Sequence, residues 1–313
     1  MSDPYDKKLV QKADDTVNAI IRDALQDKKG FAVVGEAPAG AGKSYAIGTA
    51  VKAALKKGLR VAVASPTNEQ AFSLIAAMAP RLGKKDVLTY VPARNLNVPE
   101  TVKAHANVRR VEAKDANSGS LIVGTLSKLG DAFARKSLEP VDLLLIDEAF
   151  QANAVHYFGV ADLAERHLLM GDRGQLAPFS TAAEGHRWRG LDEDPLLTSA
   201  EVVQRNHPHT TRVHKLPITR RLDARGVKIA QAFYPGHVFG AAVLAGVRAL
   251  ALAKAQKKTV LDAALEMAAN SGWAHLEMSG LADGLADPPT IKFMVDLVKR
   301  LLARQPTVTC EHS

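Results

Sequence analysis

The chain has 313 residues, 47% of them hydrophobic and 24% charged, which is typical of a globular protein long enough for more than one compact unit. It contains no run of about 18 apolar residues and begins with polar, acidic residues, so we expect neither a membrane span nor a secretory signal. The only cysteine, Cys310, excludes an internal disulfide and a cysteine-based zinc cluster and favours a reducing, cytoplasmic location, while the formal net charge of +8 favours polyanionic partners.

Apolar periodicity predicts a helix over residues 7–27, and a short apolar run at 31–34 predicts a strand buried on both faces. Four similar runs predict further buried strands, with two helices between them: strands at 61–64, 121–123, 143–146 and 168–170, and helices at 43–56 and 69–79. Strands that alternate with helices are typical of an α/β fold with a parallel sheet. Ligands of such sheets bind at the carboxyl ends of the strands.

Other stretches depart from this alternation. Residues 80–119 are basic and contain prolines, so we expect a basic excursion from the core, and residues 181–212 are expected to be irregular. Further along, alanine-rich helices are predicted over 240–257 and 259–270, and an amphipathic helix over 291–304.

A glycine-rich loop lies between the first predicted strand and the helix at 43–56. Its glycines let backbone N–H groups approach phosphate oxygens, and the helix N-terminus adds positive potential. Lys43 is placed to reach the β and γ phosphates and Ser44 to ligate Mg²⁺, although Ala37 stands where the consensus loop has its first glycine. We therefore expect ATP and Mg²⁺ as cofactors, held by Pro38, Ala39, Gly40, Ala41, Gly42, Lys43, Ser44 and Tyr45.

Two adjacent acids, Asp147 and Glu148, follow the predicted strand at 143–146. Asp147 at the strand tip is placed to hold Mg²⁺ together with Ser44. Glu148 is then the candidate general base for the attacking water.

Two segments carry a family resemblance. Residues 143–151, which end in Asp-Glu-Ala-Phe-Gln, and residues 168–178, which contain Gly-Asp-Arg-Gly-Gln-Leu-Ala-Pro, resemble motifs II and III of superfamily 1 helicases. The second pattern is the specific one, because kinases, packaging motors and transporter ATPases normally lack it. The Asp-Glu-Ala-x-Gln form of motif II resembles the branch that contains the nonsense-mediated-decay helicases.

Further segments resemble other motifs of this family, in the same order. Residues 64–68 resemble motif Ia, residues 124–126 a later backbone-contacting motif, and residues 216–221 motif IV. The resemblance implies that four residues bind a nucleic-acid backbone without reading its sequence: Pro66, Thr67, Asn68 and Thr125.

The resemblance also implies roles at the nucleotide. Gln175 would contact the γ phosphate or the attacking water, and Arg221, with Arg220 as its rival, would stabilise charge on the transferring phosphoryl group. Together with Lys43, Asp147 and Glu148 these are the expected catalytic residues. Gln11 is a candidate for the adenine-reading glutamine, although it lies unusually far upstream.

The fold implied by the resemblance is α/β: a RecA-like P-loop NTPase with a central parallel sheet flanked by helices, followed by a partial second lobe rich in helix. We interpret residues 1–30 as a helical extension, 31–215 as the ATPase lobe and 216–313 as the partial second lobe. Motifs V and VI are not found after residue 240, so the remainder of that lobe is expected from a longer chain or a partner.

The implied function is an ATP-dependent translocase or helicase that moves 5′ to 3′ on single-stranded DNA or RNA. Two alternatives stay open: a single-lobe ATPase resembling the PhoH family, and a nucleotide-switched nucleic-acid-binding module without unwinding activity. Among the remaining features, His207, His209 and His214 are expected at the surface rather than in a metal site. Trp188, between two arginines, fits either base stacking or the anchoring of a loop.

Overall fold

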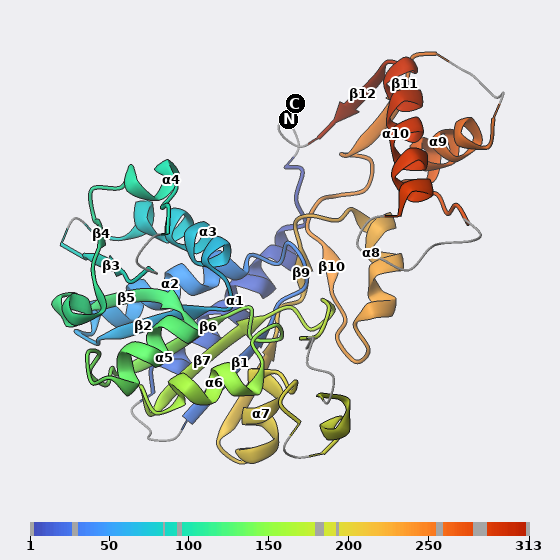
Figure 1. Ribbon diagram of the computed structural model, residues 1–313. Helices are drawn as coiled ribbons and strands as arrows, with labels where there is room; N and C mark the ends of the chain where they lie inside the picture. Colours follow the sequence, from blue (N-terminus) through green and yellow to red (C-terminus); the bar gives the residue numbers. More distant parts are fainter. Residues whose placement is uncertain are drawn as a thin grey trace. The chain divides into compact units, whose positions relative to one another are not determined.

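The computed structural model describes residues 3–26, 31–83, 85–92, 96–178, 185–191, 194–254, 259–277 and 287–310 (Figure 1). The chain divides into two compact units. The larger unit is Gln11–Pro217, and the smaller one combines Met1–Val10 with Ile218–Ser313.

The described part of the larger unit contains an eight-stranded sheet in the order β4-β3-β5-β2-β6-β7-β1-β8. Every pair of neighbouring strands is parallel. The strands are β1 (Phe31–Glu36), β2 (Val61–Ser65), β3 (Leu88–Tyr90), β4 (Val108–Arg110), β5 (Leu121–Thr125), β6 (Leu143–Asp147), β7 (Arg166–Gly171) and β8 (Thr211–Lys215). The predicted α/β class is therefore confirmed.

Helices cover both faces of this sheet (Figure 1). Helices α1, α2 and α3 lie on one face, and helices α5, α6 and α7 on the other. Their bounds are α1 (Lys7–Ala24), α2 (Lys43–Lys56), α3 (Asn68–Met78), α5 (Leu126–Ala134), α6 (Ala154–Ala161) and α7 (Ser199–Asn206), and a short helix α4 (Glu100–Lys103) precedes β4. Strands β2 and β6 are buried along their whole length, as expected of apolar runs enclosed between two helical layers.

The prediction for residues 80–119 is wrong in part, because this stretch supplies two strands of the sheet. Strand β3 is fully buried, and Thr89 donates its hydroxyl to the carbonyl of Leu121 over 2.9 Å. Burial raises the pKa of Tyr90 to about 12, and its hydroxyl donates to Asn68. Both strands are three residues long, which is too short for a hydrophobic pattern to stand out against the basic residues around them.

Residues 181–212 also contain regular structure that the sequence did not indicate. Helix α7 begins at a capping box in which Thr198 and Glu201 satisfy each other's backbone N–H groups. Strand β8 begins at Thr211 and pairs with β1 at the edge of the sheet. Its sequence mixes basic and apolar residues because an edge strand has less apolar surface to cover.

His214 is not the surface residue that was expected. It lies on β8 with its side chain 19% exposed, and its Nε2 is 2.9 Å from a carboxylate oxygen of Asp23 on α1. Burial opposes ionisation of Asp23, but the hydrogen bond with His214 and the Arg212 charge lower its pKa overall. His207 and His209 are exposed as predicted, and the described residues hold no cluster of three or more potential metal ligands.

The smaller unit contains two small sheets and three helices in its described part. Strands β9 (Ile218–Thr219) and β10 (Gly240–Ala241) pair in parallel, and β11 (Ala249–Leu252) and β12 (Pro306–Thr309) pair antiparallel. Its helices are α8 (Ala224–Ala230), α9 (Val260–Ser271) and α10 (Pro288–Ala303).

The predicted helix over residues 240–257 is wrong. Its described residues form β10 and β11, separated by a turn in which Gly246 has a φ of 82°. Alanine favours helices by less than about 1 kcal/mol per residue, and pairing with a neighbouring strand outweighs that preference here.

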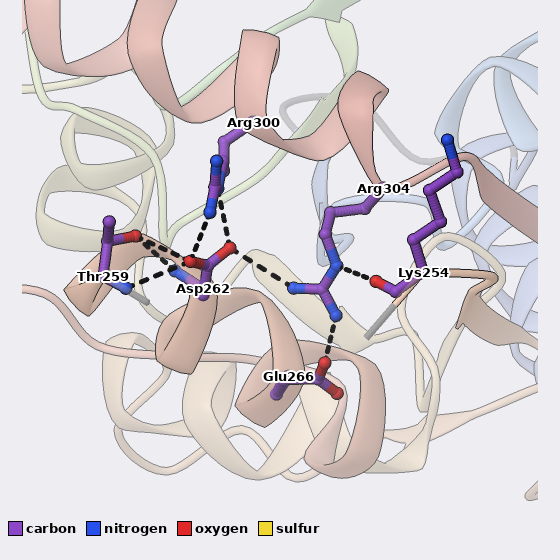
Figure 2. A network of polar contacts seen from close by, with 6 residues as sticks. All are labelled: Lys254, Thr259, Asp262, Glu266, Arg300 and Arg304. Atoms are coloured by element: carbon purple, nitrogen blue, oxygen red, sulfur yellow. Dashed lines mark hydrogen bonds and ion pairs between the residues drawn. The ribbon is translucent and has the colours of Figure 1, made fainter. Parts of the chain in front are cut away.

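A buried network of charges links α9 and α10 (Figure 2). Asp262 is fully buried and accepts from Nε and Nη2 of Arg300, each at 2.7 Å. Arg304, also fully buried, binds Glu266 and the carbonyl of Lys254. Two carboxylates thus face two guanidinium groups, so the charges are balanced inside the unit.

None of the helices within the described residues combines the length and the apolar character needed to cross a lipid bilayer.

Candidate nucleotide site

The glycine-rich loop lies between the carboxyl end of β1 and the first turn of α2. Gly40 and Gly42 have φ values of 77° and 94°, which side chains with a Cβ rarely adopt. Gly42 is the N-cap of α2, and no side chain caps this helix. The first N–H groups of α2 are therefore able to bind an anion.

Ala37 occupies the position at which the consensus loop has a glycine. Its φ is not positive, and its side chain is 2% exposed. Its N–H donates to the carbonyl of Gly171 over 2.8 Å, which ties the start of the loop to β7. A small residue with ordinary backbone angles is sufficient here, which explains why the departure from the consensus is tolerated.

Lys43 and the acidic pair at the end of β6 meet, as the sequence predicted for residues of one site. The Nζ atom of Lys43 is 3.3 Å from Oδ1 of Asp147 and forms a closer ion pair with Glu148. All three side chains are at most 16% exposed. The lysine therefore offsets part of the negative charge of the two acids.

Glu148 has a strained backbone and a perturbed side chain. Its φ is 55°, in the left-handed region that non-glycine residues seldom occupy. Burial raises the pKa of its carboxyl, Lys43 opposes this rise, and the neighbouring Asp147 adds to it. A carboxyl whose pKa is raised accepts protons more readily than an ordinary glutamate, which suits a general base.

The residues predicted to hold Mg²⁺ are chemically suited to it. Ser44 and Asp147 offer hydroxyl and carboxylate oxygens, the hard ligands that Mg²⁺ prefers, and phosphates and water would supply the others. Oε2 of Glu148 is buried and has no hydrogen-bond partner among the described residues, as expected of an acidic site that accommodates a water or a cation.

Gly171 allows the loop after β7 to approach the turn after β6. A Cβ at this position would lie 2.9 Å from the backbone nitrogens of both Ala149 and Phe150. The Ala149 N–H donates to the carbonyl of Met170 over 2.9 Å, which holds the two segments together. Gly171, the first glycine of the Gly-Asp-Arg-Gly-Gln segment, is thus required because the two motifs pack closely against each other.

Side-chain amides connect the two motifs further. Gln175 donates to a carboxylate oxygen of Asp172 over 3.3 Å and accepts from Nε2 of Gln151. Gln151 in turn accepts from Nε2 of Gln70, on α3, over 2.8 Å. Gln151 stands at the end of the segment that resembles motif II but was given no contact, and Gln70 was assigned nothing, because the partners of both amides are set only by the folded chain.

The four residues expected to bind a nucleic-acid backbone lie at the carboxyl ends of β2 and β5. These strands are neighbours, and Ser65 is paired with Thr125. Thr67 is the N-cap of α3 and accepts from the Gln70 N–H, which leaves its hydroxyl hydrogen able to donate to a phosphate. Thr125 caps α5 in the same way, and Asn68 accepts from Tyr90, which leaves the Asn68 amide N–H groups able to donate.

All the predicted site residues stay predictions, among them Gln11, Tyr45 and Arg221. Gln11 is exposed on α1 and donates to Asp15 on the same helix. Tyr45 is 49% exposed, with the guanidinium of Arg81 5.3 Å from its ring centre. Arg221 is exposed in the smaller unit, where its carbonyl accepts from Nη1 of Arg248 and its N–H donates to Thr219.

A buried acid next to the phosphate loop was also missed. Glu36, the last residue of β1, is 1% exposed and pairs with Arg173 at 3.4 Å and with Lys215 at 3.7 Å. It joins the loop after β7 and the end of β8 to the strand that carries the phosphate loop. The available signal was an acid separated by a single glycine from the apolar run at 31–34.

Trp188, for which two interpretations were open, is 48% exposed in a short 3-10 helix. Its exposure leaves both base stacking and loop anchoring open.

Comparison with known proteins agrees with this geometry. A family model described as an AAA domain matches residues 14–215. No curated protein matches the sequence. The parallel eight-stranded sheet, its flanking helices and the phosphate loop at the end of β1 make this a RecA-like P-loop NTPase fold, as predicted.

Solved structures with a similar backbone include three helicases. The Arterivirus nonstructural protein 10 helicase in complex with DNA has 16% identity and a TM-score of 0.44, and the match covers 74% of this chain and 45% of that one. The UvsW helicase from bacteriophage T4 has 10% identity and a TM-score of 0.41, with 64% of this chain and 58% of that one covered. The Hef helicase domain from Pyrococcus furiosus has 17% identity and a TM-score of 0.39, with 68% of this chain and 40% of that one covered. This chain thus spans at most 58% of the length of any of the three.

Proposed function

Since the chain belongs to the AAA domain family, we propose that it is an ATP hydrolase of the superfamily 1 helicase type that moves 5′ to 3′ along single-stranded nucleic acid. The observation that carries the proposal is that Lys43 forms ion pairs with Asp147 and Glu148 at the carboxyl ends of the strands, where the phosphate loop lies. The direction and the Asp-Glu-Ala-x-Gln branch rest on the resemblance of motif II.

In the proposed reaction Lys43 leaves its two acids and binds the β and γ phosphates, while the loop and the N-terminus of α2 bind phosphate oxygens. Glu148 accepts a proton from the water that attacks the γ phosphorus, and Gln175 orients that water. Mg²⁺, held by Ser44 and Asp147, would neutralise charge on the phosphates. ADP and inorganic phosphate are the products.

The nucleic-acid strand is proposed to cross the carboxyl ends of β2 and β5. Thr67, Asn68 and Thr125 would donate to its phosphates, with Pro66 shaping the turn. Such contacts ignore the bases, and the positive net charge of the chain favours them.

The smaller unit is proposed to be part of a second lobe that supplies Arg221 to the γ phosphate. Support comes from α10, whose apolar residues are unusually exposed, Ile291 by 53%, Val298 by 50% and Leu302 by 64%. A helix with such a face is expected to pack against further protein, here the rest of the lobe.

Stopped-flow measurement on end-labelled single strands tests the proposal. We expect ATP and Mg²⁺ to change the fluorescence of a label at the 3′ end after a delay that grows with strand length, because a motor moving 5′ to 3′ arrives there last. A label at the 5′ end should show no such delay. Signals that do not depend on strand length at either end would contradict translocation. A delay that grows with strand length at the 5′ end would instead indicate movement from 3′ to 5′. DNA and RNA strands of one sequence show which is used.

A further inference from the structure

A chain of hydrogen bonds joins the turn that contains Thr67 to the loop that contains Gln175. The Thr67 N–H donates to Oε1 of Gln70 over 3.0 Å, and Nε2 of Gln70 donates to Oε1 of Gln151 over 2.8 Å. Gln151 donates to Gln175, which donates to Asp172 over 3.3 Å. These hydrogen bonds connect five residues from three separate segments of the larger unit. The three segments follow the carboxyl ends of β2, β6 and β7.

The direction of this chain is set at both ends. A backbone N–H, here that of Thr67, can only donate, and a carboxylate, here that of Asp172, can only accept. Each glutamine between them must therefore accept through its oxygen and donate through its nitrogen. No single amide can turn over without breaking a bond to its neighbour, so the orientations of the three side chains depend on one another.

We propose that Gln70 and Gln151 are positioning residues that couple the binding of a nucleic-acid strand at Thr67 to the orientation of Gln175 at the nucleotide. The inference rests on the proposed function, since it assumes that a strand binds at Thr67 and a nucleotide beside Gln175. It adds two residues to that function and states how the two sites communicate.

The coupling follows from the double role of Gln70. Its oxygen completes the capping box of α3, and its nitrogen starts the path to Gln151. A phosphate that binds the Thr67 hydroxyl pulls on the capping box and shifts Gln70, and the shift passes through Gln151 to Gln175. By thermodynamic linkage a nucleotide that repositions Gln175 changes the affinity of the strand by the same factor.

Glutamate variants break the path while they preserve the shape of the side chains. Gln70→Glu keeps the oxygen that accepts from Thr67, and glutamate is itself a common capping-box residue, so α3 stays capped. It loses the donor to Gln151. Gln151→Glu keeps the acceptor for Gln70 and loses the donor to Gln175. Gln204→Glu is the matched control, because the donor it loses binds the carbonyl of Ala200 on its own helix and lies outside the path from Thr67 to Asp172.

The measured quantity is the coupling factor: the ratio of the dissociation constants of a fluorescein-labelled oligodeoxythymidine without and with a non-hydrolysable ATP analogue and Mg²⁺. A typical factor lies between about 5 and 150 in either direction.

We expect Gln70→Glu and Gln151→Glu to bring the coupling factor close to 1, with no further loss in the double variant because both act on one path. Gln204→Glu should keep the wild-type factor. A merely structural role would lower the melting temperature without removing the coupling.

Each other result has a distinct meaning. Wild-type coupling that persists in both glutamate variants would overturn the path and leave the proposed function standing. Binding of both ligands by the wild type with a factor of 1 would likewise overturn it. A wild type that binds neither strand nor nucleotide would defeat the proposed function, and the path with it. If Gln151→Glu does not fold, Gln70→Glu decides alone, since its helix cap is intact.

Discussion

At the scale of single residues, Glu148 has more unusual features than any other described residue of the candidate site. Its positive φ, its buried and unpartnered Oε2 and its raised pKa all lie at the end of β6, beside Lys43. Backbone strain of this kind costs about 1 to 3 kcal/mol and persists where the surrounding structure enforces it. Burial and strain at one carboxyl are the features that support the role of proton acceptor proposed for Glu148.

Glu148→Gln should separate nucleotide binding from hydrolysis. The amide keeps the size of the side chain but cannot accept a proton, so we expect kcat to fall by about 10² to 10⁴. Binding of a fluorescent ATP analogue should be retained, because the phosphate loop is untouched. A variant that hydrolyses ATP at the wild-type rate would remove Glu148 from the role of general base.

At the scale of elements, the outcome of prediction followed both the burial and the length of each strand. Strands β2, β5, β6 and β7 are enclosed on both faces, so their sequences are continuous apolar runs and were predicted. Strands β3, β4 and β8 are short or at an edge, and their pairing partners rather than their own residues make them strands. The site was predictable to the same degree: Asp147 and Glu148 stand at the end of a long apolar run and Lys43 in a recognisable loop motif, whereas Gln70 acquires its partner Gln151 only in the folded chain.

His167 on β7 gives the stability of α6 a pH dependence. Its Nδ1 is 2.7 Å from the Tyr157 hydroxyl, and its Nε2 is 2.8 Å from the carbonyl of Ala164, an arrangement that suits the neutral ring. Burial lowers its pKa below the ordinary 6.5, so the folded protein binds fewer protons than the unfolded one. The stability it confers is present above pH 6.5 and is lost as the pH falls through the folded-state value.

We therefore expect wild-type melting temperature to fall between about pH 8 and about pH 5 by more than that of His167→Gln. Glutamine can accept a hydrogen bond from the Tyr157 hydroxyl and donate one to the carbonyl of Ala164, but it does not titrate. Melting curves at the two pH values measure the difference. Equal falls in both proteins would show that His167 carries no such stability.

The charge network in the smaller unit predicts a sharp loss of stability (Figure 2). Asp262→Asn leaves Arg300 and the buried Arg304 without their shared carboxylate, which should cost about 3 to 5 kcal/mol. Asp296→Asn, an exposed acid on the same helix as Arg300, is the control and should change stability by less than about 0.5 kcal/mol. Urea unfolding of both variants compares them, and equal losses would contradict a stabilising role of the network.

At the scale of the whole molecule, the family match covers residues 14–215, and the proposed contribution of the smaller unit rests on Arg221 and on the exposed apolar face of α10. Sequence could order the motifs along the chain, but it could not show whether Arg221 acts on the nucleotide, because Arg221 and the phosphate loop belong to different units. The larger unit contains the phosphate loop, the acidic pair and the candidate strand-binding turns. It therefore contains most of what the proposed activity needs.

Whether this chain is an ATP hydrolase is decided by measuring phosphate release from ATP. With Mg²⁺ present, we expect turnover by the wild type, and we expect single-stranded DNA or RNA to increase it. Lys43→Ala should abolish it, because the lysine forms ion pairs with both acids at the site and is placed to bind the phosphates. A wild-type rate no higher than that of Lys43→Ala, with and without either strand, would contradict the assignment of this chain as an ATP hydrolase.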